Sequence, residues 1–86
     1  MRYEYDENKS LSNEQKHGIN FEGAKLLWKD DRMVEIETLY EDEIRFINIG
    51  RIETKFYTIV TTYREDKIRI ISARRSRRKE IEIYES

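Results

Sequence analysis

The chain has 86 residues, which is enough for one small domain but not for two hydrophobic cores. It contains no cysteine and one histidine, so the composition excludes a disulfide framework, a thiolate metal site and a zinc site with several histidines. Its 17 basic and 18 acidic residues nearly cancel, and six tyrosines, three phenylalanines and one tryptophan argue against a disordered polyelectrolyte.

The N-terminal segment predicts a short strand and a helix. The alternation in Arg2–Tyr5 is compatible with a first strand. Asp6 fits the N-cap of a polar helix that ends at His17, and Gly18 fits the left-handed position just past a helix end.

A second helix is predicted directly after the first. It starts at Asn20 and ends at Asp30 and Asp31. Its apolar residues fall on one stripe of a helix: Phe21, Ala24, Leu27 and Trp28. The two helices, separated by a short link, form an αα-hairpin.

From Met33 onward the apolar period changes to two, which predicts strands. Four segments show this period, with short polar links between them: residues 33–38, 44–52, 55–63 and 67–72. Consecutive strands with such short links form an antiparallel meander. The segment 55–63 is apolar on both faces, so we expect it to be the central strand.

The remaining tail, Ala73–Glu85, predicts a C-terminal helix with a thin apolar edge at Ile81 and Tyr84. Residues 1–86 are therefore expected to form a single α+β domain with an N-terminal αα-hairpin, an antiparallel sheet of about four strands and a C-terminal helix. No apolar leader follows Met1, and the apolar runs are far shorter than the ~20 residues that span a bilayer. We expect a soluble cytoplasmic protein with no membrane segment.

Charge is distributed unevenly along the chain. Residues 64–86 hold 8 basic and 5 acidic residues, whereas residues 1–63 hold 9 basic and 13 acidic ones. Five of the six residues from Arg74 to Lys79 are cationic. A near-neutral protein that concentrates cations in this way is expected to present them to an anionic partner, and phosphate is the usual candidate.

Three sequence blocks occur in an order and spacing that point to a known family. The first block spans Tyr3–Ala24 and contains YEYDENK and KHGINFEGA. The second is EIRFINIGR at Glu43–Arg51, and the third is RIISARR at Arg69–Arg75, followed by Glu80 and Tyr84. Together they resemble the BrnT family, the ribonuclease toxins of bacterial type II toxin–antitoxin operons.

The resemblance implies a compact fold like that of the RelE and ParE toxins, an RNA substrate and translation inhibition. It also implies a small DNA-binding antitoxin, BrnA, so that operator DNA is reached only through the antitoxin. No cofactor and no metal are expected. Tyr5 and Asp31 depart from the common family pattern, which has Trp and Pro at these positions, and the departures concern local packing rather than activity.

Metal-independent RNA cleavage begins when the ribose 2′-hydroxyl attacks the neighbouring phosphate. The enzyme must accept that proton, stabilise the extra negative charge on phosphorus and protonate the leaving oxygen. A guanidinium group grips two phosphate oxygens at once, and positioned charge is usually the largest catalytic contribution. Because acid–base groups add only about 10²–10⁴-fold, several arginines with few such groups are enough for slow cleavage.

Our candidates for stabilising the phosphate are four arginines in or next to the predicted strands: Arg45, Arg51, Arg69 and Arg74. Arg45 and Arg51 lie six residues apart, so both point to one face if no bulge intervenes. An arginine in a strand can equally lie on a solvated face or pair with a carboxylate, and Glu43 is two residues from Arg45. Arg69 and Arg74 fall in the most specific block, which favours function.

His17 is the natural general acid or base because only histidine has an unperturbed pKa near neutrality. A histidine just before Gly18 also serves to cap a helix C-terminus, and we favour that role. Glu43 and Glu80 are alternative bases, although ion pairs with nearby arginines explain both more simply.

A run of cations in the predicted C-terminal segment is expected to bind the RNA backbone or the antitoxin: Arg75, Arg77, Arg78 and Lys79. A solvated helix is also compatible with this run. Two other functions therefore stay open. One is a non-catalytic RNA- or protein-binding module that uses this basic helix, and the other is a toxin of the same fold with another target. Arginines inside strands, Arg51 and Arg69, favour the ribonuclease over the binding module, because a module that binds through its tail needs only the basic helix.

Overall fold

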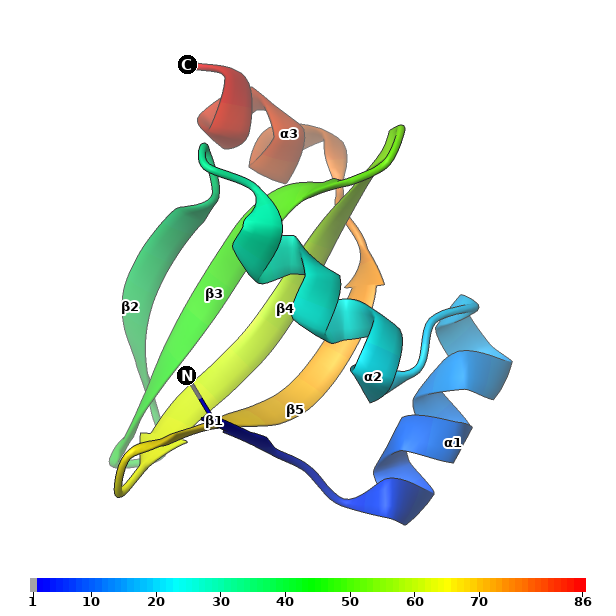
Figure 1. Ribbon diagram of the computed structural model, residues 1–86. Helices are drawn as coiled ribbons and strands as arrows, with labels where there is room; N and C mark the ends of the chain where they lie inside the picture. The colour runs from blue at the N-terminus through cyan, green and yellow to red at the C-terminus, as the bar shows by residue number, and fades with distance from the viewer. Residues whose placement is uncertain (1) are drawn as a thin grey trace.

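The computed structural model describes residues 2–86 and contains a five-stranded sheet with helices on both sides (Figure 1). The elements follow the order β1 (Arg2–Glu4), α1 (Glu7–His17), α2 (Phe21–Ala24), the 3₁₀ helix η1 (Lys25–Lys29), β2 (Val34–Tyr40), β3 (Glu43–Ile52), β4 (Lys55–Arg64), β5 (Lys67–Arg75) and α3 (Arg78–Glu85). The α+β class and the two successive N-terminal helical segments are confirmed. A likeness to RelE and ParE stays a prediction.

The sheet has the strand order β1-β5-β4-β3-β2 and is mixed rather than purely antiparallel. Strands β2 to β5 form the expected antiparallel meander, with β4 in the centre. The short strand expected at Arg2–Tyr5 is present as β1, but the expected antiparallel sheet of about four strands did not include it: β1 pairs in parallel with β5. Its short span gives little sequence signal, and its partner lies 65 positions away, at Glu4 opposite Arg69.

The C-terminal segment also differs from the prediction, since Ala73 is not helical. β5 continues to Arg75, and α3 starts only at Arg78. Pairing of Arg74 with Thr58 extends the ladder, and burial of the Ala73 methyl group in the core holds this part of the strand against the helices. A local helical pattern is overridden here by tertiary contacts.

Local chemistry explains where the first two helices begin and end. The Asp6 carboxylate accepts hydrogen bonds from the backbone N–H groups of Asn8 and Lys9, at 2.8 and 3.1 Å. Gly18 has φ 76°, and its N–H donates to Glu14, as the sequence predicted. The second helix is tighter than expected, with one α-helical turn followed by η1.

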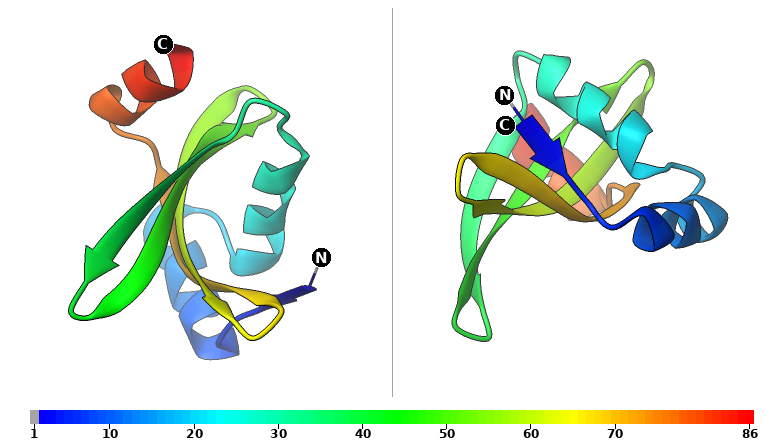
Figure 2. Two further views of the ribbon diagram at one scale, coloured as in Figure 1. Left: turned by 90° about the vertical axis from the view of Figure 1, so that its left-hand side faces the viewer. Right: turned by 60° about the horizontal axis from the view of Figure 1, so that its bottom comes forward.

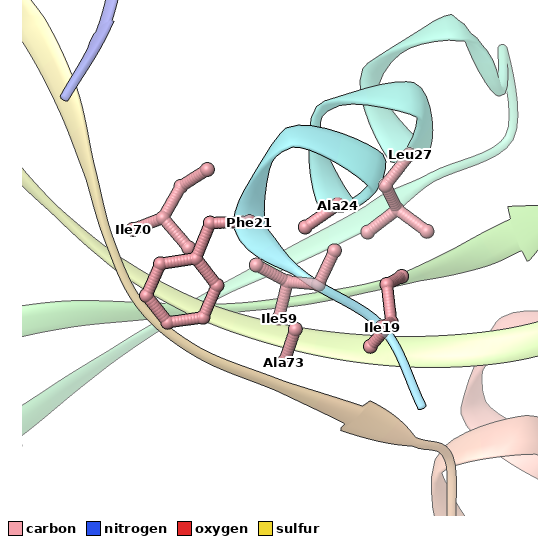
Figure 3. Packing of buried hydrophobic residues seen from close by; sticks show 7 residues of the cluster. All are labelled: Ile19, Phe21, Ala24, Leu27, Ile59, Ile70 and Ala73. Carbon is pink, nitrogen blue, oxygen red and sulfur yellow. The ribbon is translucent and has the colours of Figure 1, made fainter. Parts of the chain in front are cut away.

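The hydrophobic core lies between one face of the sheet and the segment formed by α2 and η1. Seven residues form it: Ile19, Phe21, Ala24, Leu27, Ile59, Ile70 and Ala73 (Figure 3). Tyr3 and Tyr5 extend the core with edge-to-face contacts to Trp28 and Phe21, at centroid distances of 5.5 and 5.6 Å. α3 lies on the opposite face of the sheet (Figure 2).

The edge of β5 beyond β1 is covered by a side chain. The Asn13 amide of α1 donates to the carbonyl of Ala73 at 2.7 Å and accepts from the Ala73 N–H at 3.2 Å. It also donates to Ile19 at 2.8 Å. Because Asn13 is 7% exposed, its amide replaces a missing strand partner in a dry environment.

Candidate functional site

All four candidate arginines of the strands lie on one face of the sheet, which we call the arginine face: Arg45, Arg51, Arg69 and Arg74. The register of β3 runs without a shift from Glu43 to Ile52, which places Arg45 and Arg51 on the same side, as expected. This is the face that carries α3 and not the core (Figure 2).

A β-bulge decides that Arg69 and Arg74 share this face. They lie five positions apart, so a regular strand would point them to opposite sides. The pairing of β4 with β5 shifts between Val60 and Thr61, and Ile71 is the additional residue. As a result Arg69 pairs with Thr62, and Arg74 pairs with Thr58. Bulges often turn a side chain toward a functional site in this way.

Arg69 is oriented by a carboxylate from the N-terminal strand. Its Nη1 donates to Glu4 Oε2 at 2.7 Å, and the two side chains are 31% and 25% exposed. The Arg64 guanidinium lies 3.8 Å from the same carboxylate. Glu4 occupies a single guanidinium nitrogen of Arg69, so the guanidinium keeps donors for an anionic ligand.

Arg45 approaches the same end of the face from β3. Its Cζ lies 4.3 Å from the ring centroid of Tyr40, and its Nη2 lies 3.7 Å from Glu43. The Arg45 Nε is buried and has no hydrogen-bond partner within residues 2–86. Thr62 of β4 pairs with Arg69 and donates its hydroxyl to the carbonyl of Ile44, so Arg45 and Arg69 flank β4.

Arg74 lies at the other end of the face, under α3, and both of its terminal nitrogens are hydrogen-bonded. Glu80 accepts from Arg74 Nη1 at 2.9 Å and from Nη2 at 2.7 Å, and also from the Thr58 hydroxyl at 2.9 Å. The Arg77 N–H donates to the same carboxylate at 2.7 Å. The hydrogen bonds from Arg74 lower the pKa of the Glu80 carboxyl from its ordinary 4.5 to about 2.

Arg51 lies beside an open cleft of about 1500 Å³ between η1, β3 and the end of α3. Its backbone N–H donates to Asp30 at 2.8 Å, and Tyr84 donates to the same carboxylate oxygen at 2.8 Å. Burial opposes ionisation of Asp30, but hydrogen bonds from the N–H groups of Arg51 and Arg32 hold its pKa below the ordinary value. The Arg51 guanidinium is exposed above Phe56.

The proposed acid–base residues are not brought together. His17 is exposed at the end of α1, and within residues 2–86 no hydrogen bond or ion pair joins its side chain to a candidate arginine. Glu43 is exposed beside Arg45, and Glu80 is held by Arg74. Within residues 2–86, no group of three or more His, Asp or Glu side chains is arranged to hold a metal ion.

The cationic run divides between two elements. Arg75 ends β5, with its guanidinium 5.8 Å from the ring centroid of Tyr57. The other three cations, Arg77, Arg78 and Lys79, are exposed around the start of α3. Cations near a helix N-terminus are unfavourable to the helix dipole, and the Glu80 carboxylate in the first turn compensates.

Sequence reasoning missed three residues near Arg45 and Arg69, namely Glu4, Tyr40 and Thr62. The parallel pairing of β1 with β5 brings Glu4 to Arg69, and no local pattern signals it. Tyr40 faces Arg45 because its hairpin turns after two residues. The alternation of side chains along β4 could have placed Thr62 on the same face as the arginines.

Comparison with known families identifies the relationship. The family model described as ribonuclease toxin, BrnT, of type II toxin–antitoxin systems matches residues 5–80. The chain belongs to this family. No curated protein matches the chain. The resemblance seen in the three sequence blocks is thus confirmed, and BrnT membership implies an RNA target and an antitoxin protein partner.

The BrnT match covers all four candidate arginines and ends at Glu80. Glu4 lies one residue before the matched span, although it contacts Arg69 inside it. Among residues 2–86, no helix has the length and apolar character needed to cross a membrane.

Proposed function

We propose that this BrnT-family chain is an endoribonuclease that cleaves RNA on its arginine face without a metal ion and thereby inhibits translation. The observation that carries the proposal is the placement of Arg45 and Arg69 on either side of β4. Each keeps a terminal guanidinium nitrogen without a hydrogen bond within residues 2–86: Arg45 lies 3.7 Å from Glu43, and Arg69 donates from Nη1 alone. A phosphate between them would meet two planar cations, which is the arrangement that stabilises a pentacoordinate phosphorane.

In this mechanism the ribose 2′-hydroxyl attacks the adjacent phosphorus, and the bond to the 5′-oxygen of the next nucleotide breaks. Arg69, held by Glu4, and Arg45, stacked on Tyr40, bind the non-bridging oxygens as charge develops on them. Glu43 is the proposed acid–base residue that lies beside Arg45. Glu80 is a poor base at neutral pH, since its pKa of about 2 leaves it with little affinity for a proton.

The exposed cations at the end of β5 and the start of α3 would hold the RNA backbone near this face: Arg75, Arg77, Arg78 and Lys79. Contacts of this kind give affinity without sequence preference and weaken steeply with salt. We further propose that a BrnA-like DNA-binding antitoxin neutralises the protein.

A non-catalytic RNA-binding module is the second candidate. It is favoured by one observation, the occupation of both terminal nitrogens of Arg74 by Glu80, which removes a strand arginine from phosphate binding in the free protein. In that case the cationic run alone would bind RNA.

The experiment uses purified, antitoxin-free protein and a labelled RNA in the presence of EDTA. We expect cleavage products with 2′,3′-cyclic phosphate and 5′-hydroxyl ends, because the 2′-hydroxyl is the nucleophile. Arg69→Ala and Arg45→Ala should each lower the rate about 100-fold or more. Arg32→Ala, an exposed arginine in the turn before β2, is the matched control and should cleave normally.

Three outcomes would contradict the proposal. Loss of cleavage on chelation would rule out the metal-free mechanism. Full activity in Arg45→Ala and Arg69→Ala would remove the site from the arginine face. RNA binding by the native protein without any cleavage would favour the non-catalytic module. Melting temperatures of the variants must stay close to that of the native chain for the rates to be compared.

A further inference from the structure

The outer edge of β2 is a long strand edge without a partner. The sheet order places β1 and β2 at its two edges (Figure 1). On the β1 side, the ladder to β5 and the Asn13 amide satisfy the exposed backbone. On the other side, β2 spans the seven residues Val34–Tyr40, and no element within residues 2–86 pairs with its outer side.

The hairpin geometry identifies the backbone groups that this edge presents. Glu41 and Asp42 both have positive φ, 47° and 66°, as a two-residue type I′ turn requires. In such a hairpin the closing pair, Tyr40 and Glu43, exchanges both backbone hydrogen bonds, and the pairs that do so alternate along the ladder. The N–H and C=O groups of the residues between them therefore point away from β3: Glu35, Glu37 and Leu39.

The Arg51 N–H supports this alternation from the neighbouring strand. It points toward the β2 side of β3, where it meets the carboxylate of Asp30 because β2 does not extend that far. The odd-numbered residues of β3 therefore face β2, and their partners in β2 have even numbers. Glu35, Glu37 and Leu39 are left with free backbone groups.

The side chains around this edge are acidic and apolar. The segment from residue 33 to residue 44 contains no cation and five acidic residues: Glu35, Glu37, Glu41, Asp42 and Glu43. Three large apolar side chains are exposed beside them, Leu39 at 71%, Tyr40 at 51% and Ile44 at 50%. Lysine, proline and bulges, which usually protect an edge strand, are absent from β2.

We propose that the outer edge of β2 binds an extended cationic segment of a partner polypeptide, which adds to the sheet as a sixth strand. Backbone hydrogen bonds to Glu35, Glu37 and Leu39 would provide affinity, and alternate side chains would provide specificity. Lysine or arginine side chains on every second position meet Glu35 and Glu37, and the apolar residues between them lie on the other face of the sheet, beside Ile36 and Tyr40.

Charge selects this occupant over two others. RNA is anionic and is repelled by the carboxylates along this edge, because within residues 2–86 only Glu43 of the five has an ion-pair partner, Arg45. A second copy of the chain, paired through its own β2, would set the same acidic residues against each other across the new ladder, which is destabilising. A cationic strand meets neither penalty, and this partner would bind whether or not the arginine face cleaves RNA.

The test uses ¹⁵N-labelled full-length protein and, as the probe, a capped seven-residue peptide of alternating lysine and valine. At saturation we expect amide hydrogen exchange at Glu35, Glu37 and Leu39 to slow at least about 10-fold. The inward amides of Ile36 and Thr38 serve as internal references, since they are already bonded to β3. The double variant Glu35→Gln, Glu37→Gln should weaken binding about 10-fold, whereas the exposed pair Glu14→Gln, Glu82→Gln should not.

Two matched peptides separate strand addition from charge attraction. One carries N-methyl groups on the backbone nitrogens that would face β2, so it keeps its charge but loses its donors. The other replaces every lysine with glutamate. We expect neither to protect the three amides. Protection by the N-methylated or the glutamate peptide, or none by the lysine peptide, would overturn the proposal. Concentration-dependent protection without peptide would show that a second copy is the occupant, which also overturns it.

Discussion

The Glu80 carboxylate of α3 accepts a hydrogen bond from each terminal nitrogen of Arg74 in β5, at 2.7 Å from Nη2 and 2.9 Å from Nη1. The same carboxylate takes the Thr58 hydroxyl and the Arg77 N–H. No residue of α3 is buried, so the position of this helix depends on these polar contacts and on the packing of Tyr84 against Phe56. An arginine that the sequence marks as a phosphate ligand is thus an anchor of α3 in the free protein.

This ion pair makes stability depend on pH in the acid range. Because the folded pKa of Glu80 is about 2 and its ordinary value is 4.5, the stabilisation is complete above pH 4.5 and is lost as pH falls toward 2. The ionised Glu80 carboxylate, with Arg74, the Arg77 N–H and Thr58 as its partners, should contribute a few kcal/mol in total, since lowering a pKa by one is worth about 1.4 kcal/mol. Chemical denaturation at a series of pH values between 6 and 2.5 measures the free energy of unfolding and so its dependence on pH. Glu80→Gln should flatten this dependence, and Glu82→Gln, an exposed residue of the same helix, should not. Equal slopes for the native chain and Glu80→Gln would contradict the prediction.

Asn13→Ala should destabilise the protein by about 3 kcal/mol or more. The substitution leaves the buried N–H and C=O of Ala73 and the carbonyl of Ile19 without their partner, and each orphaned group costs about 1–3 kcal/mol. Urea unfolding gives the change in free energy. Asn8→Ala, an exposed asparagine in the same helix, is the matched control and should change stability by less than about 0.5 kcal/mol. Alanine is the better helix former, so helix propensity cannot explain a loss. A similar loss in both variants would show that the hydrogen bonds of Asn13 do not carry the effect.

Two glycine-to-alanine substitutions should change the stability of the protein in opposite directions. A Cβ at position 50 would lie 3.0 Å from Leu27 Cδ1 and 3.1 Å from Asp30 Oδ2, and Leu27 is fully buried and cannot yield. Gly50→Ala should therefore cost about 1–3 kcal/mol. At Gly23 the contacts begin at 3.4 Å, so Gly23→Ala should gain up to about 1 kcal/mol from helix propensity. Thermal melts of both variants test the pair, and a gain in Gly50→Ala would refute the crowding argument.

The turn between β2 and β3 should be open to stabilisation. Glu41 and Asp42 occupy left-handed backbone conformations that cost most residues about 1–2 kcal/mol each, whereas asparagine and glycine adopt them readily. The double substitution Glu41→Asn, Asp42→Gly should raise the free energy of unfolding by about 1 kcal/mol or more. Glu7→Asn, at an exposed helical position, should give no gain. An unchanged midpoint of denaturation would mean that the turn carries no strain.

Glu4 offers a test of how Arg69 is positioned. Glu4→Gln removes the charge that holds the guanidinium at 2.7 Å, so RNA cleavage should fall about 10-fold in kcat with little change in KM. Glu7→Gln, an exposed acidic residue nearby in sequence, is the control. A fall in melting temperature that accounts for the lost activity would indicate a purely structural role for Glu4.

Much of the local structure could be read from the sequence. Asp6 and Gly18 bound the first helix because capping needs only neighbouring residues. The period of two marked all four meander strands, since the alternation of side chains is a property of a single strand. The charge of the C-terminal segment pointed to an anionic partner, and the three sequence blocks pointed to the family.

The tertiary structure alone decided how these parts meet. Glu4 reaches Arg69 through a parallel pairing of segments 65 positions apart, and Glu80 reaches Arg74 by folding α3 back over β5. The bulge at Ile71 turns Arg69 and Arg74 to the same face, although their spacing predicts opposite faces. Periodicity and caps depend on adjacent residues, whereas a register shift or an ion pair depends on the path of the whole chain. The sequence thus determined which arginines to consider, and the packing decided which of them remain free.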